Sequence, residues 1–535
     1  MEFCFTIVRM PGQILSDPQI IQPYLSDESK VTGQAQSISF PESEAEIREI
    51  LLAIQQAHQT LTVQGARTGI TGGAVPTGGH ILNLSKLNRI TGIAWDAKHE
   101  CFLLSVQPGV QLNQLNKAIA EKSFDTSSWN AQAQSAFRRF QQNGAWFLPA
   151  DITETTASIG GMVSTNASGA RSYRYGSMRR HVVGLRLLLA NGKSLTLRRG
   201  EQFAQGRQFT LRLDDGSQIT GQLPAYHMPQ VKNASGYYVH ENMDLIDLFI
   251  GSEGTLGIVT KITLALAPQP GFTWGTMAFF TNEQNALAYV HTLKSLPQSE
   301  QPIAIEYFDQ ACLALIRNEQ EQLHAHQSIP ALNPTAQSAI YTEFTAESLP
   351  KRDEAINRLA DLLNAAGGDE HATWLALSRQ DLEKLMSFRH AIPESINRII
   401  AERKRQHPNL TKLGSDMAVP DDKLDWVMRL YEDTLAQVGL EALKFGHIGD
   451  NHLHVNILPH NESEYTQGKQ LFEQWARAVV AAGGTVSAEH GIGKLKHALL
   501  AELYGAQALE EMRALKRCFD PQGLLNPGNM FPLEA

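Results

Sequence analysis

The spacing of apolar positions changes near residue 270 of this chain. Before it, a helix that begins at Pro41 and short strands at residues 61–63 and 258–266 separate long stretches of glycine, serine and threonine. Four apolar residues share one face of that helix: Ile47, Ile50, Leu51 and Ile54. Beyond residue 270, short apolar strands alternate with long amphipathic helices. We therefore expect an α+β protein of two domains, residues 36–269 and 270–531.

The second region predicts an antiparallel sheet with helices on one face. The expected strands are residues 278–281, 304–308, 338–345 and 443–458. The expected helices are residues 283–296, 351–366, 381–403, 421–438 and 473–482, followed by a helix pair at 498–519.

Composition narrows the class of protein. The 535 residues are 42% hydrophobic and 19% charged, and the net charge of −9 argues against nucleic acid as the main partner. No apolar run approaches the roughly 20 residues of a membrane span, and the first nine residues do not resemble a signal peptide. Cys4, Cys101, Cys312 and Cys518 form no C-x-x-C motif, so no cluster, structural zinc or disulfide framework is expected. We expect a cytoplasmic protein, with peripheral membrane contact left open.

Three stretches of small residues, at 64–76, 149–176 and 249–259, predict a binding site in the first region. Glycine permits left-handed backbone and lets a ligand approach the main chain closely, and exposed N–H groups can cradle an anion. The spacing fits neither the dinucleotide-binding fingerprint nor a Walker loop. Three such stretches favour one extended ligand with phosphates and a ring system over three unrelated loops.

A cluster of titratable residues lies near the C-terminus. His452, His454 and Asn456 alternate, so on a strand they share one face, and another histidine precedes them at a glycine-flanked turn. Glu489 and His490 follow about thirty residues later. Three imidazoles and a carboxylate suit a divalent metal, and a remaining imidazole suits a general base. The alternative is a surface strand with scattered histidines, in a chain that contains 18.

In order along the chain, these segments resemble motifs of FAD enzymes of the vanillyl-alcohol-oxidase type. The first stretch is similar to the pyrophosphate loop, the second to the segment around the isoalloxazine, and the third to the closing Gly-Ser-Glu-Gly-Thr-Leu-Gly-Ile element. Gly-His-Ile-Gly-Asp, Ala-Glu-His-Gly-Ile-Gly and Asp-Pro-Gln-Gly-Leu-Leu-Asn-Pro-Gly resemble the FAD-linked oxidase C-terminal domain. The whole pattern, over about residues 36–531, is similar to the D-lactate, glycolate and D-2-hydroxyglutarate dehydrogenase branch.

This resemblance implies a two-subdomain FAD-binding PCMH-type domain, then a ferredoxin-like antiparallel-sheet cap domain and a C-terminal helical segment. It assigns FAD contacts to Gly65, Arg67, Thr68, Gly69, Gly72, Gly73, Pro149, Asp151, Ser158, Gly160, Gly161, Ser164, Asn166, Gly169, Gly254, Ile258, Val259 and Asn526. Covalent relatives carry histidine in the first loop, often with cysteine in the second. Arg67 and Thr68 stand there instead and the second stretch has no cysteine, so we expect non-covalent FAD.

The resemblance also implies the reaction, in which the α-carbon of a D-2-hydroxy acid gives a hydride to flavin N5. His490 matches the family's base. His447, His454 and Glu489 match its ligands for a divalent metal, which the sequence leaves open between zinc, manganese and iron. We therefore expect a metal that polarises the hydroxyl and carboxylate of the substrate.

Arg389 matches the family's clamp for the substrate carboxylate, and Asn456 matches a further substrate contact. Lys412 lies two residues early for the family's clamp lysine. His452 stands where related sequences often have asparagine. It can be interpreted equally as an additional metal ligand or as a side chain on the solvent-exposed face of the strand.

Two segments depart from the family pattern. Residues 121–144 predict a helical insertion, and residues 198–235 look like a long polar loop; each can be a lid, a partner surface or a simple insertion. A second hypothesis keeps the flavin fold but takes an alcohol or a sugar lactone as substrate. The residues His447, His454, Glu489 and Arg389 argue against it, because they suit a carboxylated substrate. A flavin-binding subunit of an electron-transfer complex, docking through Arg138 and Arg139, is a third alternative. The electron acceptor (quinone, cytochrome or flavoprotein), the R group of the hydroxy acid and a homodimer are left open.

Overall fold

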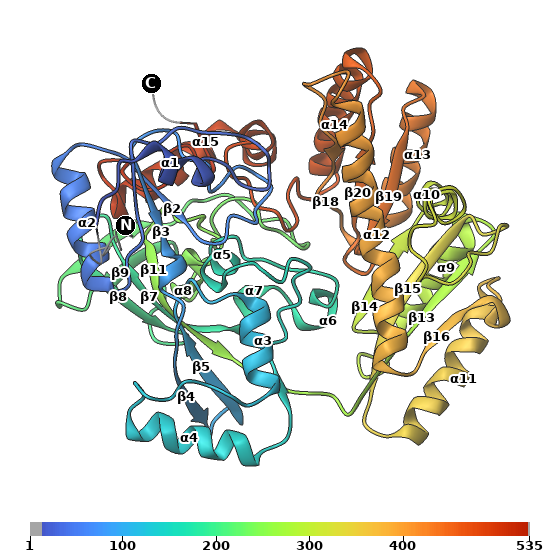
Figure 1. The fold of residues 1–535 in the computed structure, drawn as a ribbon, viewed down its shortest axis with the longest axis horizontal. Helices are drawn as coiled ribbons and strands as arrows, with labels where there is room; N and C mark the ends of the chain where they lie inside the picture. The colour runs from blue at the N-terminus through green and yellow to red at the C-terminus, as the bar shows by residue number, and fades with distance from the viewer. Residues whose placement is uncertain (1–12, 533–535) are drawn as a thin grey trace, which may run out of the picture.

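The computed structural model describes residues 13–532, so Cys4 and the first nine residues lie outside it. The chain forms two lobes that lie side by side (Figure 1). The first lobe holds the N-terminal half. The second is built on a larger sheet between Phe272 and Ile457, after which helix α15 (His497–Phe519) returns to pack in the core of the first lobe. No helix among residues 13–532 has the length and apolar content needed to cross a membrane.

The first lobe contains two main sheets. A parallel sheet has the order β1 (Ser37–Ser39), β3 (His80–Asn83) and β2 (Leu61–Gln64). An antiparallel sheet has the order β4 (Ile90–Asp96), β5 (Cys101–Val106), β11 (Ile258–Ala265), β7 (Val182–Leu188) and β8 (Ser194–Arg198). Helix α2 (Glu44–Gln56) starts at the Ser43 cap and buries the predicted apolar face, Ile47, Ile50, Leu51 and Ile54.

Short elements complete the first lobe. The helices are α1 (Pro18–Ile21), α3 (Leu112–Ala120), α5 (Ile159–Ser164), α6 (Ser172–Tyr175), α7 (Met178–His181) and α8 (Ile246–Phe249). Strand β6 (Trp146–Phe147) pairs with β12 (Ala267–Pro268). Helix α5 and the loops around it form the second glycine-rich stretch of the sequence.

The two insertions form regular structure. The predicted helix is α4 (Ala131–Gln142), whose Phe137 and Phe140 are buried in an aromatic cluster with Phe102 and Trp129. The second insertion is not a simple loop, because β9 (Gln208–Arg212) and β10 (Gln218–Gln222) form an antiparallel hairpin in it. Strand β10 is exposed or only half-buried along its length, so it does not need the alternation of apolar and polar residues that predicts a strand. The sequence of this segment therefore looked like a loop.

The second lobe is built on an eight-stranded antiparallel sheet. Its strands are β16 (Trp374–Ala376), β13 (Phe272–Phe280), β15 (Ser338–Ala346), β14 (Ala304–Phe308), β19 (Ala442–Gly446), β20 (His452–Ile457) and β17 (Leu413–Gly414), with β18 (Met417–Ala418) also pairing with β20. Helices cover both faces of this sheet, which corrects the expected single face. Met277 and Phe279 enter one core, while Ala278 and Phe280 enter the other. A strand that is apolar on both faces needs cover on both.

The helices divide between these two cores. One face packs against α9 (Glu283–Ser295), α11 (Leu349–Ala365), α13 (Leu424–Val438) and α14 (Glu462–Ala481). The other face packs against α12 (Arg379–Arg403) and α10 (Gln310–Gln322), a helix that the sequence reading missed. The remaining predicted helices are confirmed, and α14 begins eleven residues earlier than expected at Glu462.

One expected strand is in fact a hairpin. Residues 443–458 do not form one strand, because β19 and β20 pair antiparallel with Phe445 opposite His454. Gly446 and Asn451 adopt positive φ angles of 128° and 51° at the ends of the connecting turn. The turn folds His447 back beside β20. A single extended strand would instead place His447 and His454 seven residues, or roughly 23 Å, apart.

Candidate active site

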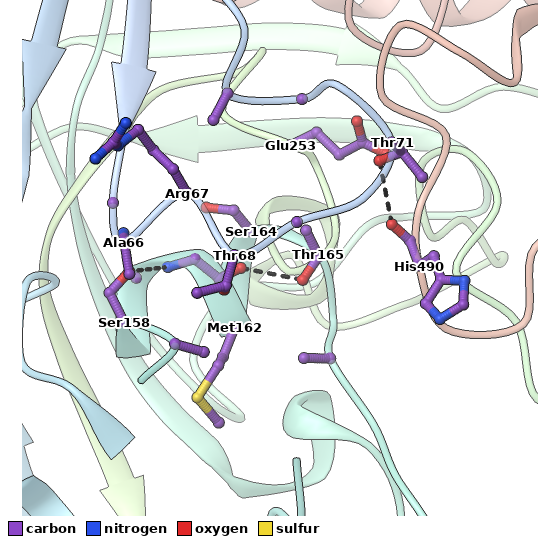
Figure 2. Close-up of a pocket in the computed structure, with 18 of the residues that line it drawn as sticks. Ala66, Arg67, Thr68, Thr71, Ser158, Met162, Ser164, Thr165, Glu253 and His490 are labelled. Atoms are coloured by element: carbon purple, nitrogen blue, oxygen red, sulfur yellow. Dashed lines mark hydrogen bonds between the residues drawn. The ribbon is translucent and has the colours of Figure 1, made fainter. Parts of the chain in front are cut away.

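A cavity of about 330 Å³ lies where the glycine-rich loops of the first lobe meet (Figure 2). Its wall is formed by many, but not all, of residues 63–74 and 152–168, together with Gly254, Asn526 and Asn529, among others. Of the positions expected to contact FAD, the following line it: Gly65, Arg67, Thr68, Gly69, Gly73, Ser158, Gly160, Gly161, Ser164, Gly254 and Asn526. Segments that are far apart in sequence therefore meet at one site.

The other expected positions lie outside this wall. Gly72 and Pro149 belong to the same two stretches, and Gly169 packs against the carbonyl of Asp151. Asn166 lines a second cavity, of about 460 Å³, on the side of Lys232 and Asp450. Ile258 and Val259 are buried in strand β11. FAD contacts at these positions stay predictions.

The glycines of the wall serve two purposes. A Cβ on Gly65 would lie 2.2 Å from Ser158 Oγ, and one on Gly254 would lie 2.4 Å from Asn526 Nδ2, so both allow loops to pack together. At Gly69 no heavy atom of the described chain lies within 4 Å of such a Cβ. The main chain around Gly69 is thus open to the cavity, and this fits a ligand laid directly against the backbone.

Arg67 braces the first loop from behind. The residue has a positive φ of 62°, and its guanidinium donates to the carbonyls of Pro23 and Ser26. It also lies 4.6 Å from the ring centroid of Tyr24. The guanidinium of Arg67 therefore contacts the N-terminal segment, although the residue also lines the cavity.

The loop that carries Glu489 and His490 is tied to this cavity. Glu253 accepts hydrogen bonds from the backbone N–H groups of Ile492 (2.7 Å) and Gly493 (2.8 Å). The Thr71 hydroxyl donates to the His490 carbonyl at 3.3 Å, as Figure 2 shows. Glu489 and His490 consequently line the same cavity as the glycine-rich loops. The sequence reading did not single out Glu253, which is buried at 5% exposure.

The three predicted metal ligands converge behind this loop. His447 Nε2 lies 3.3 Å from Glu489 Oε2, and His454 Nε2 lies 3.3 Å from Glu489 Oε1. The other ring nitrogens are already oriented, because His447 Nδ1 bonds Glu306 at 2.6 Å and His454 Nδ1 bonds the Ser415 carbonyl at 3.0 Å. Metal-binding histidines typically have their second nitrogen held in this way. The donor set therefore fits a divalent metal.

Asp416 organises the opposite side of the cluster. Its fully buried carboxylate lies 3.2 Å from His490 Nδ1 and accepts from Lys496 Nζ at 2.7 Å. It also accepts from the backbone N–H groups of Glu489 (3.2 Å) and His490 (3.1 Å). Burial by itself raises the pKa of Asp416, but these cationic neighbours and hydrogen bonds hold it well below its usual range. Asp416 thus orients the His490 ring in the manner of a base-orienting carboxylate.

The same contacts perturb the histidines. Burial lowers the pKa of His490, but the charge of Asp416 and its hydrogen bond outweigh burial and raise the pKa to about 9. Burial lowers the pKa of His452 to about 3, so this ring is neutral. Strongly perturbed titratable groups close to a cavity are typical of functional sites.

Lys232 enters the cluster from the second insertion. Its Nζ donates to Glu489 Oε2 at 2.7 Å and lies 3.9 Å from Asp450 Oδ2. Burial raises the pKa of Glu489, yet Lys232 and His447 hold it well below its usual range. No spacing in the sequence connects residue 232 with residue 489, so this residue was missed.

The expected substrate residues lie around the cluster. Arg389, on α12, donates from Nε to Glu306 at 2.9 Å and from Nη2 to Thr153, a residue of the cavity wall, at 3.4 Å. Asn456 is buried two positions after His454 on the same strand face. Lys412 Nζ donates to Asn397 at 2.9 Å. Glu306 therefore links Arg389 to His447, a connection absent from the sequence reading.

Two family models match this chain. The FAD binding domain matches residues 35–136 and 132–198, and the FAD linked oxidases, C-terminal domain, matches residues 275–530. The chain belongs to the FAD-linked oxidases. It is therefore a flavoprotein oxidoreductase, as the sequence motifs implied.

Curated relatives cover almost the whole chain. The glycolate oxidase subunit GlcD of Bacillus subtilis is 26% identical over 92% of this chain and 88% of its own. The D-lactate dehydrogenase of Archaeoglobus fulgidus is 27% identical over 92% and 90%. The mitochondrial D-2-hydroxyglutarate dehydrogenase of Bos taurus is 27% identical over 98% and 82%.

Solved structures share the fold. A 4-ethylphenol oxidase from Gulosibacter chungangensis superposes with a TM-score of 0.64 at 18% identity, over 97% of this chain and 94% of that one. An alkyldihydroxyacetonephosphate synthase gives a TM-score of 0.60 at 15% identity, over 98% and 83%. The expected PCMH-type α+β architecture is thereby confirmed.

Proposed function

We propose that this FAD-linked oxidase is a dehydrogenase that oxidises a D-2-hydroxy acid of the lactate, glycolate or 2-hydroxyglutarate class to the 2-oxo acid. The observation that supports the proposal is the meeting of Glu489 and His490 with the glycine-rich loops in one cavity wall. A proposed base and a proposed metal ligand thus face the cavity in which we propose that FAD binds. The curated relatives named for glycolate, D-lactate and D-2-hydroxyglutarate agree with this substrate class.

The loop residues around Gly69, Gly161 and Gly254 would hold FAD without a covalent bond, and the bound flavin would supply a hydride acceptor at N5. The substrate loses its α-hydrogen as hydride and its hydroxyl proton to His490. Asp416 keeps the Nδ1 side of that imidazole in a hydrogen bond, so the substrate proton would go to Nε2, which in the structure lies 3.5 Å from Glu489 Oε1. His490 must begin the step as the neutral ring, so a cation held beside Glu489 would favour its deprotonation.

A divalent metal would be held by His447, His454 and Glu489, with zinc, manganese and iron as candidates. Such an ion supplies Lewis-acid polarisation of the hydroxyl and carboxylate. Arg389 would hold the carboxylate through the edge of its guanidinium that Glu306 does not use. Asn456 contributes a further amide contact beside the cluster.

Anaerobic flavin bleaching tests the substrate class. We expect D-2-hydroxy acids to bleach the bound flavin and their L-enantiomers to leave it oxidised. Bleaching by simple alcohols or sugar lactones but by no hydroxy acid would contradict the proposal. Turnover with a dye acceptor by the purified chain would exclude a subunit that is inactive alone.

Non-covalent FAD gives a direct prediction. Precipitation with trichloroacetic acid should leave the yellow chromophore in the supernatant, because neither Arg67 nor Thr68 can form the usual attachment. Yellow colour that remains in the pellet would disprove it.

Arg389→Lys should weaken substrate capture more than FAD binding. Lysine keeps the charge but loses the two-pronged geometry, a difference of about 1.5–3 kcal/mol for a charged hydrogen bond. Steady-state kinetics should show KM raised on the order of 10–100-fold, and flavin absorbance should report unchanged FAD content. Arg405→Lys, on the segment after α12, is the matched control. An unchanged KM for every acid that turns over would show that Arg389 does not hold substrate.

Other features stay predictions. They are the division into residues 36–269 and 270–531, the cytoplasmic location with membrane contact open, the homodimer, and a quinone, cytochrome or flavoprotein as electron acceptor.

A further inference from the structure

His452 is the one histidine of the proposed metal cluster whose role the sequence left undecided. The residue is completely buried, so it does not lie on a solvent-exposed face of β20. Neither of its ring nitrogens has a hydrogen-bond partner among residues 13–532, although Nε2 lies 3.0 Å from Asp416 Oδ1. Its Nδ1 lies 3.9 Å from Glu489 Oε2. A buried polar nitrogen without a partner is therefore directed at the carboxylate of a proposed metal ligand.

We infer that His452 is a metal ligand through Nδ1 and completes a site of three histidines and one glutamate. The inference rests on the metal site of the proposed function. The four candidate side chains His447, His452, His454 and Glu489 each offer a donor atom, and these atoms all lie within 4.8 Å of one another. Donors that share one zinc ion at ~2.0–2.2 Å lie about 3.4 Å apart in a tetrahedron, so a small closure of the cluster suffices.

The surroundings of His452 prepare it for this role. Asp416 beside Nε2 favours the tautomer with hydrogen on Nε2 and leaves the Nδ1 lone pair free. Glu306 does the same for His447 with the nitrogens exchanged, since it bonds Nδ1 and leaves Nε2 free. His447 and His452 thus each have a carboxylate near the outer nitrogen, while His454 has the Ser415 carbonyl there, and both kinds of partner are usual behind metal-binding imidazoles.

Lys232 does not prevent occupation of the site. Its ammonium bonds Glu489 Oε2, the oxygen that also faces His447 and His452, whereas Oε1 lies toward His454 and His490. Asp450 Oδ2, which has no hydrogen-bond partner among the described residues, lies 3.9 Å from Lys232 Nζ. The ammonium therefore has a second carboxylate available when a cation takes Glu489.

Three imidazoles narrow the choice of metal. Nitrogen-rich donor sets suit zinc and iron, while manganese prefers oxygen donors. With four protein ligands, substrate oxygen would have to enter as a fifth. The preference of this site for zinc over manganese should consequently be greater than that of a site with only two histidines.

X-ray absorption of the zinc-loaded holoenzyme tests the inference without any substitution. Multiple scattering from imidazole should require three histidines per zinc. A fit with two histidines would overturn the role of His452 and leave the proposed metal site standing. Failure to bind zinc stoichiometrically would overturn both.

His452→Asn provides the second test, with His460→Asn as the control because His460 is exposed after β20 and pairs with Glu441. Chelator competition should show zinc affinity reduced on the order of 100-fold in His452→Asn, since even outer partners of metal ligands are worth 10–100-fold. FAD content should stay at the wild-type level. An affinity within threefold of the control would overturn the inference. If the variant loses FAD, the absorption result on the wild-type enzyme decides.

Discussion

Replacement of His490 by alanine should lower the rate of flavin reduction by on the order of 10²–10⁴-fold, the usual contribution of a positioned base. The hydroxyl proton would lose its acceptor, while the loops around Gly69 that fit FAD are untouched. Stopped-flow absorbance under anaerobic conditions measures this half-reaction directly. FAD and metal contents should equal those of the wild type, because His490 is not among the proposed ligands.

Two comparisons make this result specific. His291→Ala removes a half-exposed histidine that pairs with Asp425 on the second lobe and should not change the rate. Metal analysis of His490→Ala separates loss of a base from loss of an ion. A wild-type rate of flavin reduction in His490→Ala would mean that the proton leaves by another route.

Removal of the metal should abolish turnover without disturbing the flavin spectrum. Lewis-acid stabilisation is worth several kcal/mol, so chelation should reduce turnover on the order of 10³-fold. Added zinc or manganese should restore it. His447→Ala should have the same effect through loss of one ligand, and metal analysis should report substoichiometric metal.

The same variant can refute the assignment. Full metal content together with a full rate in His447→Ala would show that the cluster is structural. Loss of FAD in the chelated protein would instead show that FAD binding depends on the metal, through the cavity wall that Glu489 shares with the glycine-rich loops.

The family and the flavin-binding segments could be predicted from sequence because their information is local. Each glycine-rich stretch is one continuous segment of the chain, and its small residues are needed wherever the backbone approaches a ligand or another loop. The 3.6-residue period likewise predicted the buried face of α2. The alternation of His452 and His454 correctly placed both on one face of β20, where the rings lie 4.5 Å apart.

Only the tertiary structure decided how the cluster closes. The turn after β19 brings His447 against β20, and Glu306, Asp416 and Lys232 reach the site from separate elements. Glu306 is 141 positions from His447, and Lys232 is 257 positions from Glu489. Buried charges are stable only beside partners that satisfy them, and packing of distant elements selects those partners. The spacing of residues along the chain does not predict these distant partners. A glycine-rich loop can be predicted because the residues that determine its conformation lie within the loop.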